Sequence, residues 1–270
     1  MIRVSISLQR IIVSALILTS IVGVLNLTPS QPAYAATYTI APGGGDCNAA
    51  NTATPIGVWD AKRLKCTLKF DINGSIEITG DGITLDGAKH TLTGDGTGNG
   101  VNVVLRTGVT VKNVIVKNFV TGINLEESNG NTLTGNTANS NVERGIELDA
   151  SNGNTLTRNT ANSNSVGIEL VGADGNTLTS NTANSNSIYG ILIQSAANNF
   201  LQKNTASLNI TGGFGLSADT NTALKGNTAN SNGLFGYISA GSTGLITSKN
   251  KCSGNGSGGS DPTGLCLPQP

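Results

Sequence analysis

One phrase, NTLTxNTANSN, dominates this sequence and begins at Asn131, Asn154 and Asn176. Looser copies of it continue almost to the C-terminus. Two asparagine columns five residues apart mark the repeat, with spacings of 22 or 23 residues. The first is Asn113, Asn136, Asn159, Asn181, Asn204, Asn227 and Asn250, and the second is Asn118, Asn141, Asn164, Asn186, Asn209, Asn232 and Asn255. A fixed period of this length without a helical hydrophobic pattern predicts a solenoid with one coil per repeat.

Apolar residues fall into columns when the repeats are aligned on these asparagines. Two of the columns are two residues apart, which is the periodicity of a strand whose alternate side chains share one face. The columns are Ile123, Ile146, Ile168, Ile191, Phe214 and Tyr237; Leu125, Leu148, Leu170, Ile193 and Leu216; Leu133, Leu156, Leu178, Leu201 and Leu224; and Ile115, Ala138, Ala161, Ala183, Ala206 and Ala229. Each coil is therefore predicted to consist of short strands joined by turns.

The asparagine columns are predicted to be structural. Amide side chains stacked at the strand spacing of about 4.8 Å can hydrogen-bond to one another along the axis of a solenoid. The predicted ladder consists of Asn136, Asn159, Asn181, Asn204 and Asn227, with Asn141, Asn164, Asn186, Asn209 and Asn232 beside them. His90 and Asp95 are expected to form the first rung, one period before Asn113 and Asn118.

The repeat N-x-L-x-x-N-x-A-x-x-N-x-x-x-G-I-x-L, over about residues 76 to 255, resembles the β-helix repeats of the pectin-lyase-like superfamily. Within it, the sequence is most similar to the carbohydrate-binding and sugar-hydrolase repeat class, which includes the periplasmic maturation protein of nitrous oxide reductase. This resemblance implies an all-β, single-stranded, right-handed parallel β-helix. We expect about eight coils of 22–23 residues with three short strands each. Because the superfamily contains lyases, hydrolases, adhesins and non-enzymatic proteins, the resemblance implies a fold and not an activity.

Four segments are predicted. Residues 1–35 have a basic start, an apolar stretch and the small-residue motif Ala33-Tyr34-Ala35, which are typical of a cleaved signal peptide. A retained membrane anchor is the alternative. An N-terminal cap with a disulfide (36–75), the repeats (76–251) and a C-terminal cap loop and tail (252–270) follow. The mature protein is expected to be secreted, extracellular or periplasmic, without a membrane span.

The cysteines lie in two pairs, just before and just after the repeats. In an exported chain they are expected to form the disulfides Cys47–Cys66 and Cys252–Cys266. The other two connectivities would have to span the solenoid. A disulfide that closes a local loop of this size stabilises the folded protein by about 3 kcal/mol in the chain-entropy model.

Composition limits the partners. Removal of residues 1–35 takes away 2 of the 16 basic residues and none of the 16 acidic ones, so the formal net charge becomes 14 − 16 = −2. We expect no basic patch and no binding of nucleic acid. No metal site is predicted. A relative in the repeat class suggests copper, but the ligands that copper prefers are scarce here: the chain has one His, no Met beyond Met1 and only paired Cys.

Acidic side chains cluster in two outward columns of the middle coils. The predicted ligand-binding residues are Asn124, Glu126, Glu147, Asp149 and Glu169, and Glu147, Glu169 and Asp149 are also the candidates for catalysis. Carboxylates one coil apart, at about 4.8 Å, could share a proton or hold calcium, the one cofactor considered. The coils are uniform, without the long loops that wall a catalytic cleft, and the middle coils lack His.

Non-catalytic recognition of an extended ligand such as a polysaccharide is therefore the predicted function. A polysaccharide lyase or glycoside hydrolase of pectin-lyase-like type is one alternative. The other is an ice-binding or purely structural surface protein, because Thr recurs in outward positions such as Thr132, Thr155 and Thr177. Thr is also simply a good strand residue.

Overall fold

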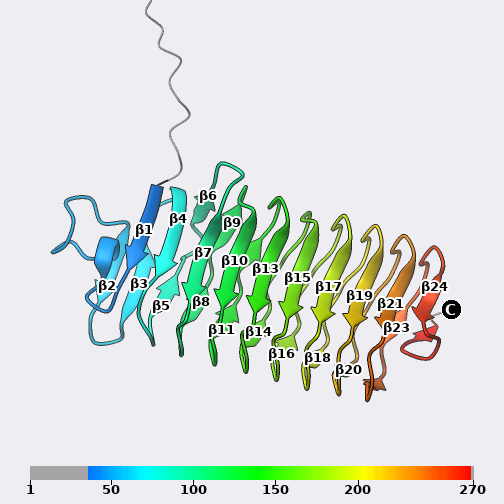
Figure 1. Ribbon diagram of the computed structural model, residues 1–270. Helices are drawn as coiled ribbons and strands as arrows, with labels where there is room; N and C mark the ends of the chain where they lie inside the picture. Colours follow the sequence, from blue (N-terminus) through cyan, green and yellow to red (C-terminus); the bar gives the residue numbers. More distant parts are fainter. Residues whose placement is uncertain (1–35, 269–270) are drawn as a thin grey trace, which may run out of the picture. The chain divides into compact units, whose positions relative to one another are not determined.

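The computed structural model describes residues 36–268, and the predicted signal peptide lies outside these residues. The described chain is a parallel β-solenoid of about nine turns, slightly more than the eight expected. Figure 1 shows the coils stacked one behind the next. The only helix in residues 36–268 is the short 3₁₀ helix η2 (Gly45–Cys47).

Three faces run along the solenoid. Face A contains β1 (Ala36–Ile40), β4 (Ile72–Ile78), β7 (Asn99–Val104), β10 (Thr121–Glu126), β13 (Arg144–Asp149), β15 (Val166–Val171), β17 (Tyr189–Gln194), β19 (Gly212–Ser217), β21 (Phe235–Ala240) and β24 (Gly258–Asp261). Face B contains β2 (Gly57–Asp60), β3 (Lys65–Leu68), β5 (Thr84–Asp86), β8 (Thr110–Lys112), β11 (Thr132–Thr134), β14 (Thr155–Thr157), β16 (Thr177–Thr179), β18 (Phe200–Gln202), β20 (Ala223–Lys225) and β22 (Ile246–Ser248). Face C contains β6 (Thr91–Thr93), β9 (Ile115–Lys117), β12 (Thr137–Ala138), β23 (Lys251–Cys252) and β25 (Leu267–Pro268). The named strands pair in parallel, except for the antiparallel hairpin β2–β3.

The third strand of each coil is shorter than predicted. Between β12 and β23, face C is held by single parallel bridges, one per coil, as at Thr160↔Thr182 and Thr182↔Thr205. Sharp corners on both sides of this segment leave room for only two or three extended residues. The coil is therefore a triangle with one very short side.

The core is a stack of apolar rungs. The two predicted columns on face A and the leucine column on face B are buried and pair in the predicted register, as at Ile146↔Ile168 and Leu156↔Leu178. The fourth predicted column is wrong at its first member, because Ala138 pairs with Val116 and not with Ile115. Phe214 and Tyr237 continue the rungs, with ring planes 5° apart and centroids at 4.7 Å.

Both asparagine columns begin one coil later than the alignment predicted. The structure stacks Asn136 on Val114 and Asn141 on Phe119, whose backbone N–H groups donate to the amide oxygens at 3.2 Å. Asn113 and Asn118 instead occupy left-handed corners, with φ of 52° and 62°. The spacing between these coils is 22 residues, and asparagine is favoured both in a ladder and in a left-handed corner. His90 precedes Val114 in the same column, but it contacts Asp71 on the surface.

From Asn136 and Asn141 onward the amides form buried ladders. Asn159 illustrates the pattern: its backbone N–H and its Nδ2 donate to Oδ1 of Asn181 at 2.9 and 3.0 Å, and Nδ2 also donates to Leu133 O at 2.9 Å. A third ladder, which the sequence analysis missed, lies at the corner between faces A and B. It consists of Asn131, Asn154, Asn176 and Asn199. Its signal was present as the same period of 22 or 23 residues.

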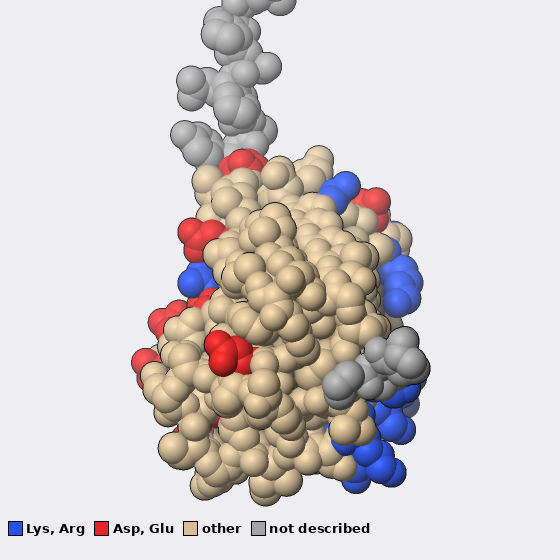
Figure 2. Space-filling model, turned by 90° about the vertical axis from the view of Figure 1, so that its right-hand side faces the viewer, with Lys and Arg blue, Asp and Glu red and all other residues tan. Residues whose placement is uncertain are grey.

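Charged side chains are segregated around the coils. In the view from the right-hand side of Figure 1, most of the visible Asp and Glu lie on one side and most of the Lys and Arg on the other (Figure 2). Arg158, Lys203 and Lys249 occupy the same corner position in coils two apart, so cations that are distant in the sequence fall on one side of the fold. The expectation that the chain has no basic patch is therefore wrong for the folded surface.

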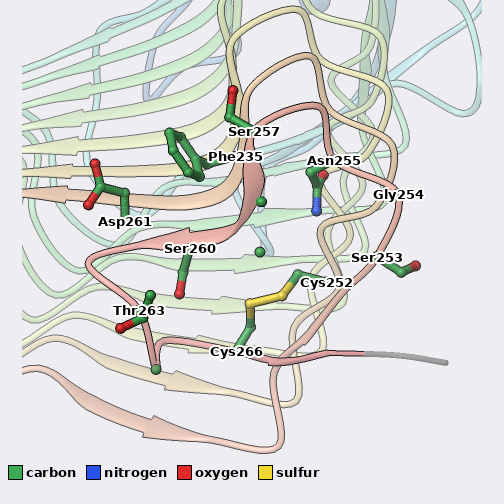
Figure 3. Close-up of a pocket in the computed structure, with 13 residues that line it drawn as sticks. Phe235, Cys252, Ser253, Gly254, Asn255, Ser257, Ser260, Asp261, Thr263 and Cys266 are labelled. Atoms are coloured by element: carbon green, nitrogen blue, oxygen red, sulfur yellow. A yellow bond between two sulfur atoms is a disulfide. The ribbon is translucent and has the colours of Figure 1, made fainter.

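Both ends carry a disulfide, Cys47–Cys66 and Cys252–Cys266. At the N-terminal end, the β2–β3 hairpin places Trp59 against Gly44, where a Cβ would lie 2.8 Å from Cγ of the indole. At the C-terminal end, Ser260 replaces the aromatic rung and leaves an open cavity of about 600 Å³ (Figure 3). The Cys252–Cys266 disulfide, Phe235 and Asp261 line this cavity.

Candidate ligand-binding face

The predicted acidic residues lie on the outer surface of face A. The register of β10, β13 and β15 places Asn124, Glu147 and Glu169 in one outward column. Glu126 and Asp149 form the neighbouring column on the same strands. Strand alternation turns Leu125, Leu148 and Leu170 inward and thereby turns these polar side chains outward.

Arg144 is the centre of this cluster, a role that the sequence analysis did not assign to it. Its Nε donates to Oε2 of Glu169 and lies 3.2 Å from Oε1 of Glu147, and its Nη1 donates to Oε2 of Glu143 at 2.7 Å. It stands at the first position of β13, and its side chain contacts Glu147 on the same strand and Glu169 on the adjacent strand β15. One cation therefore joins carboxylates from two adjacent strands.

Polar neighbours complete the cluster. The Thr121 hydroxyl donates to Oε2 of Glu147 at 3.3 Å, and Nε2 of Gln194 donates to Oε1 of Glu169 at 3.4 Å. The side chain of Glu169 is only 7% exposed and that of Glu147 is 18% exposed. These two carboxylates are thus held in place by their neighbours on β10, β13 and β17.

The electrostatics of the pair follow from this burial. Desolvation raises the pKa of Glu147; attraction by Arg144 opposes the rise, and the charge of Glu169 adds to it. Burial would lower the pKa of Arg144, but the hydrogen bond to Glu169 and the nearby carboxylates raise it. Arg144 therefore stays charged while Glu147 takes up a proton more readily than an exposed glutamate.

The other predicted ligand residues are separate from this cluster. Asn124 is buried, and its Nδ2 donates to Oδ1 of Asn102 at 3.0 Å. Glu126 and Asp149 are exposed, and neither makes an ion pair among the described residues. The structure thus brings Glu147 and Glu169 together, leaves Glu126 and Asp149 in solvent and ties Asn124 into the sheet.

An aromatic ring lies next to the carboxylates. Tyr189 begins β17 and occupies the same outward column as Arg144, two coils further on. A Cβ at Gly212 would lie 2.9 Å from Cε1 of Tyr189, and a Cβ at Gly215 would lie 3.0 Å from the same atom. The ring therefore lies along the sheet over the two glycines of the next coil, which have no side chain to lift it away.

Arg144, Glu169, Tyr189 and Gln194 line one open depression with a volume of about 390 Å³. Glu143 and Ser165 add polar groups to its wall, and Val166, Leu192 and the exposed Ile188 add apolar ones. The sequence pattern did not identify this site, because strand alternation would place Tyr189, two residues before the buried Ile191, on the inner side of β17. The glycines under the ring could be recognised only from the fold.

The fold and this face define a pectin-lyase-like parallel β-helix protein that presents a charged and aromatic outer surface. The model of a family described as periplasmic copper-binding protein (NosD) matches residues 74–257, and the chain belongs to this family. A comparison with curated proteins found no match.

Solved β-helix structures share the fold at low sequence identity. The Azotobacter vinelandii mannuronan C-5 epimerase AlgE6 A-module has a TM-score of 0.53 at 11% identity, and the match covers 87% of this chain and 89% of that one. Pectate lyase Pel9A has a TM-score of 0.55 at 16% identity, over 81% and 70% of the two chains. The periplasmic alginate epimerase AlgG has a TM-score of 0.50 at 17% identity, over 81% and 55%. The chain thus spans about half the length of AlgG, and these similarities describe the fold alone.

The donor set of the described residues does not fit the copper of the family description. Copper in proteins is bound by His, Met and Cys. His90 is the one histidine of the chain and contacts Asp71 at 3.3 Å, and all four cysteines are in disulfides. Residues 36–268 contain no group of three or more His, Cys, Asp or Glu side chains arranged to hold a metal. They also contain no helix long and apolar enough to cross a membrane.

Proposed function

We propose that this protein recognises a polysaccharide on face A without cleaving it, in the periplasm, where its family is described to reside. The observation that carries the proposal is the depression in which the Tyr189 ring lies flat beside Arg144, Glu169 and Gln194. A sugar presents an apolar ring face and a rim of hydroxyls. An aromatic ring beside fixed carboxylate and amide groups complements both surfaces.

The charge around the depression selects among sugars. Glu143, Glu147 and Glu169 surround the single cation Arg144, and Glu126 and Asp149 lie in the next column. This excess of carboxylates repels a polyuronate, so the ligand on face A is a neutral or amino-sugar polysaccharide. The straight stack of coils allows an extended chain to continue along the face past the depression.

A polysaccharide hydrolase is the second candidate. The observation that favours it is the pKa of Glu147, which burial raises beside a second carboxylate, because a general acid must keep its proton. A variant with Glu147→Gln and Glu169→Gln separates the two functions. A catalytic pair predicts retained binding with loss of product formation, whereas a binding pair predicts loss of retention on the glycan.

The ice-binding alternative rests on Thr132, Thr155 and Thr177 of face B, and the polar side chains of the adjoining face C do not extend that surface. Its outward asparagines are engaged along the axis: Oδ1 of Asn139 accepts the backbone N–H of Asn162, and Oδ1 of Asn162 accepts that of Asn184, both at 2.8 Å. These amides stabilise the stack and leave fewer groups free to order water.

The test is binding of the mature protein to an array of neutral, amino-sugar and uronate polysaccharides. Tyr189→Ala is expected to weaken binding about tenfold, or about 1.4 kcal/mol, because the stacking ring is lost. Phe200→Ala removes a partly exposed aromatic ring from face B and is the matched control. Equal affinities of the Tyr189→Ala variant and the wild type would refute the site. Preferential binding to uronates would refute the inference that face A prefers a neutral or amino-sugar polysaccharide.

A further inference from the structure

After Arg144, every Lys and Arg of the chain lies on the corner between faces B and C or directly beside it. These residues are Arg158, Lys203, Lys225, Lys249 and Lys251, and we call them the basic ridge. Consecutive members are 22 to 45 residues apart in the sequence, except for Lys249 and Lys251, which are two apart, so the linear chain shows no larger cluster of charge. Figure 2 shows Lys and Arg gathered on this side of the molecule.

The spacing of the basic ridge follows from the coil. Arg158, Ser180, Lys203, Gly226 and Lys249 occupy the same left-handed corner in five successive coils, with φ between 55° and 63°. Cations therefore alternate with small residues, and consecutive cations in this column are two coils, or about 9.6 Å, apart. Lys225 on β20 and Lys251 on β23 flank the column from the two adjoining faces.

The basic ridge has no counter-charge within the described residues. All five side chains belong to exposed residues, and none of them makes an ion pair among residues 36–268. The acidic residues of the same coils are elsewhere: Glu169 is on face A, Asp174 is at the corner between faces A and B, Asp219 is buried, and Asp261 is on β24. A line of uncompensated positive charge therefore runs along one corner of several coils.

We propose that the basic ridge is a second binding surface, which takes a linear anionic polysaccharide bearing carboxylate or sulfate groups. The cations stand in a straight line at regular intervals, and a stiff glycan with a charge on every one or two sugars matches such a line. The columns beside the corner hold Thr, Gln, Ser and Lys, as at Thr157, Gln202 and Thr205, and no aromatic ring. Single-stranded nucleic acid is usually held by cations together with aromatic stacking, which this corner does not offer.

This proposal is independent of the site on face A. The two surfaces have opposite charge, so the ridge attracts the polyanions that face A repels. The protein would then hold an anionic polymer on one side and a neutral or amino-sugar polymer on another.

The experiment compares the binding of the mature protein to carboxymethyl cellulose and to hydroxyethyl cellulose, which share a backbone and differ in charge. Binding to the charged polymer alone is expected. If all five cations contribute, affinity should fall about a hundredfold between about 50 and 200 mM salt, since each contact with a single-stranded polyelectrolyte contributes a slope near −0.7. The triple variant K203E/K225E/K249E should reduce binding below detection.

The control variant is K62E/R63E/K69E, which makes the same change in net charge on exposed residues near the β2–β3 hairpin. It is expected to bind like the wild type, and both variants should keep the wild-type melting temperature. Equal binding by the triple ridge variant and the wild type, or equal binding to the two celluloses, would overturn the proposal. Tighter binding to oligo(dT) or to anionic phospholipid vesicles than to carboxymethyl cellulose would also overturn it, in favour of that ligand.

Discussion

Nδ2 of Asn159 lies 3.0 Å from Oδ1 of Asn181 in the next coil, and the same oxygen accepts the backbone N–H of Asn159 at 2.9 Å. One side chain thus satisfies both the backbone and the amide of its neighbour. The asparagines from Asn136 to Asn227 in this column repeat the contact, so the ladder fixes the stacking of the coils with buried hydrogen bonds.

Asn181→Leu is expected to destabilise the protein by roughly 3–5 kcal/mol. The substitution leaves the backbone and side-chain N–H groups of Asn159 without an acceptor and Leu156 O without its donor at 2.9 Å. Thr182→Ser, at the next and partly exposed position, is the control and should be nearly neutral. Thermal or urea unfolding measures both, and equal stabilities would contradict a structural role for the buried ladder.

Glu147→Gln is expected to leave the protein at least as stable as the wild type at pH 7. Burial raises the folded-state pKa of Glu147 above its unfolded value, so its contribution to stability is fully present below the unfolded pKa and is lost as pH rises through the folded pKa. The glutamine variant lacks this titration, and its advantage should disappear in acid. Asp149→Asn, in the exposed neighbouring column, is the control. If Glu147→Gln destabilises the protein more at pH 7 than at pH 4, burial does not raise the pKa of Glu147 in the folded state.

Asp86→Asn is expected to lower the free energy of unfolding by about 1 kcal/mol, which is the upper end of the range for a partly exposed ion pair. Burial opposes its ionisation, but hydrogen bonds from Lys65 and the Ala88 N–H lower the pKa of Asp86 to about 2. Lys112 adds a second cation at 3.4 Å. Since the folded pKa is depressed, this stability is present above the unfolded pKa and is lost as pH falls through about 2.

Unfolding of the Asp86→Asn variant should accordingly depend less on pH between about 4 and 2 than unfolding of the wild type. Asp60→Asn is the control and should change this pH dependence less, because the ion-pair partner of Asp60 is the exposed Arg63 three residues along the chain. If both variants titrate like the wild type, Asp86 does not link β3, β5 and β8 as the structure indicates.

Gly190→Ala is expected to cost at least about 2 kcal/mol by overpacking. A Cβ at this position would lie 2.6 Å from Ala183 O and 2.8 Å from Nδ2 of the ladder residue Asn209. Gly43→Ala introduces the same methyl group where no atom lies within 4 Å and is expected to be neutral. Melting temperatures of the two variants that agree within error would show that the coil can relax around a side chain at Gly190.

Local features of the sequence determined the class of fold. The spacing of two residues between Ile146 and Leu148 predicts a strand. The period of 22 or 23 residues that relates them to Ile168 and Leu170 predicts a coil. These predictions need no knowledge of side-chain orientation, because every rung repeats its neighbour. The same regularity misled the alignment at Asn113, since asparagine suits both a ladder rung and the adjacent left-handed corner.

Only the tertiary structure decided the surfaces. The sequence identified Glu147 and Glu169 as neighbours in one column, but it could not show that Arg144 contacts both of them, or that Tyr189 lies over glycines of the next coil. These contacts join residues about one coil apart through side-chain conformations that no periodic pattern specifies. The basic ridge has the same origin: Arg158 and Lys203 are 45 residues apart in the chain, and coiling brings them to one corner because the solenoid superimposes equal phases of its repeat.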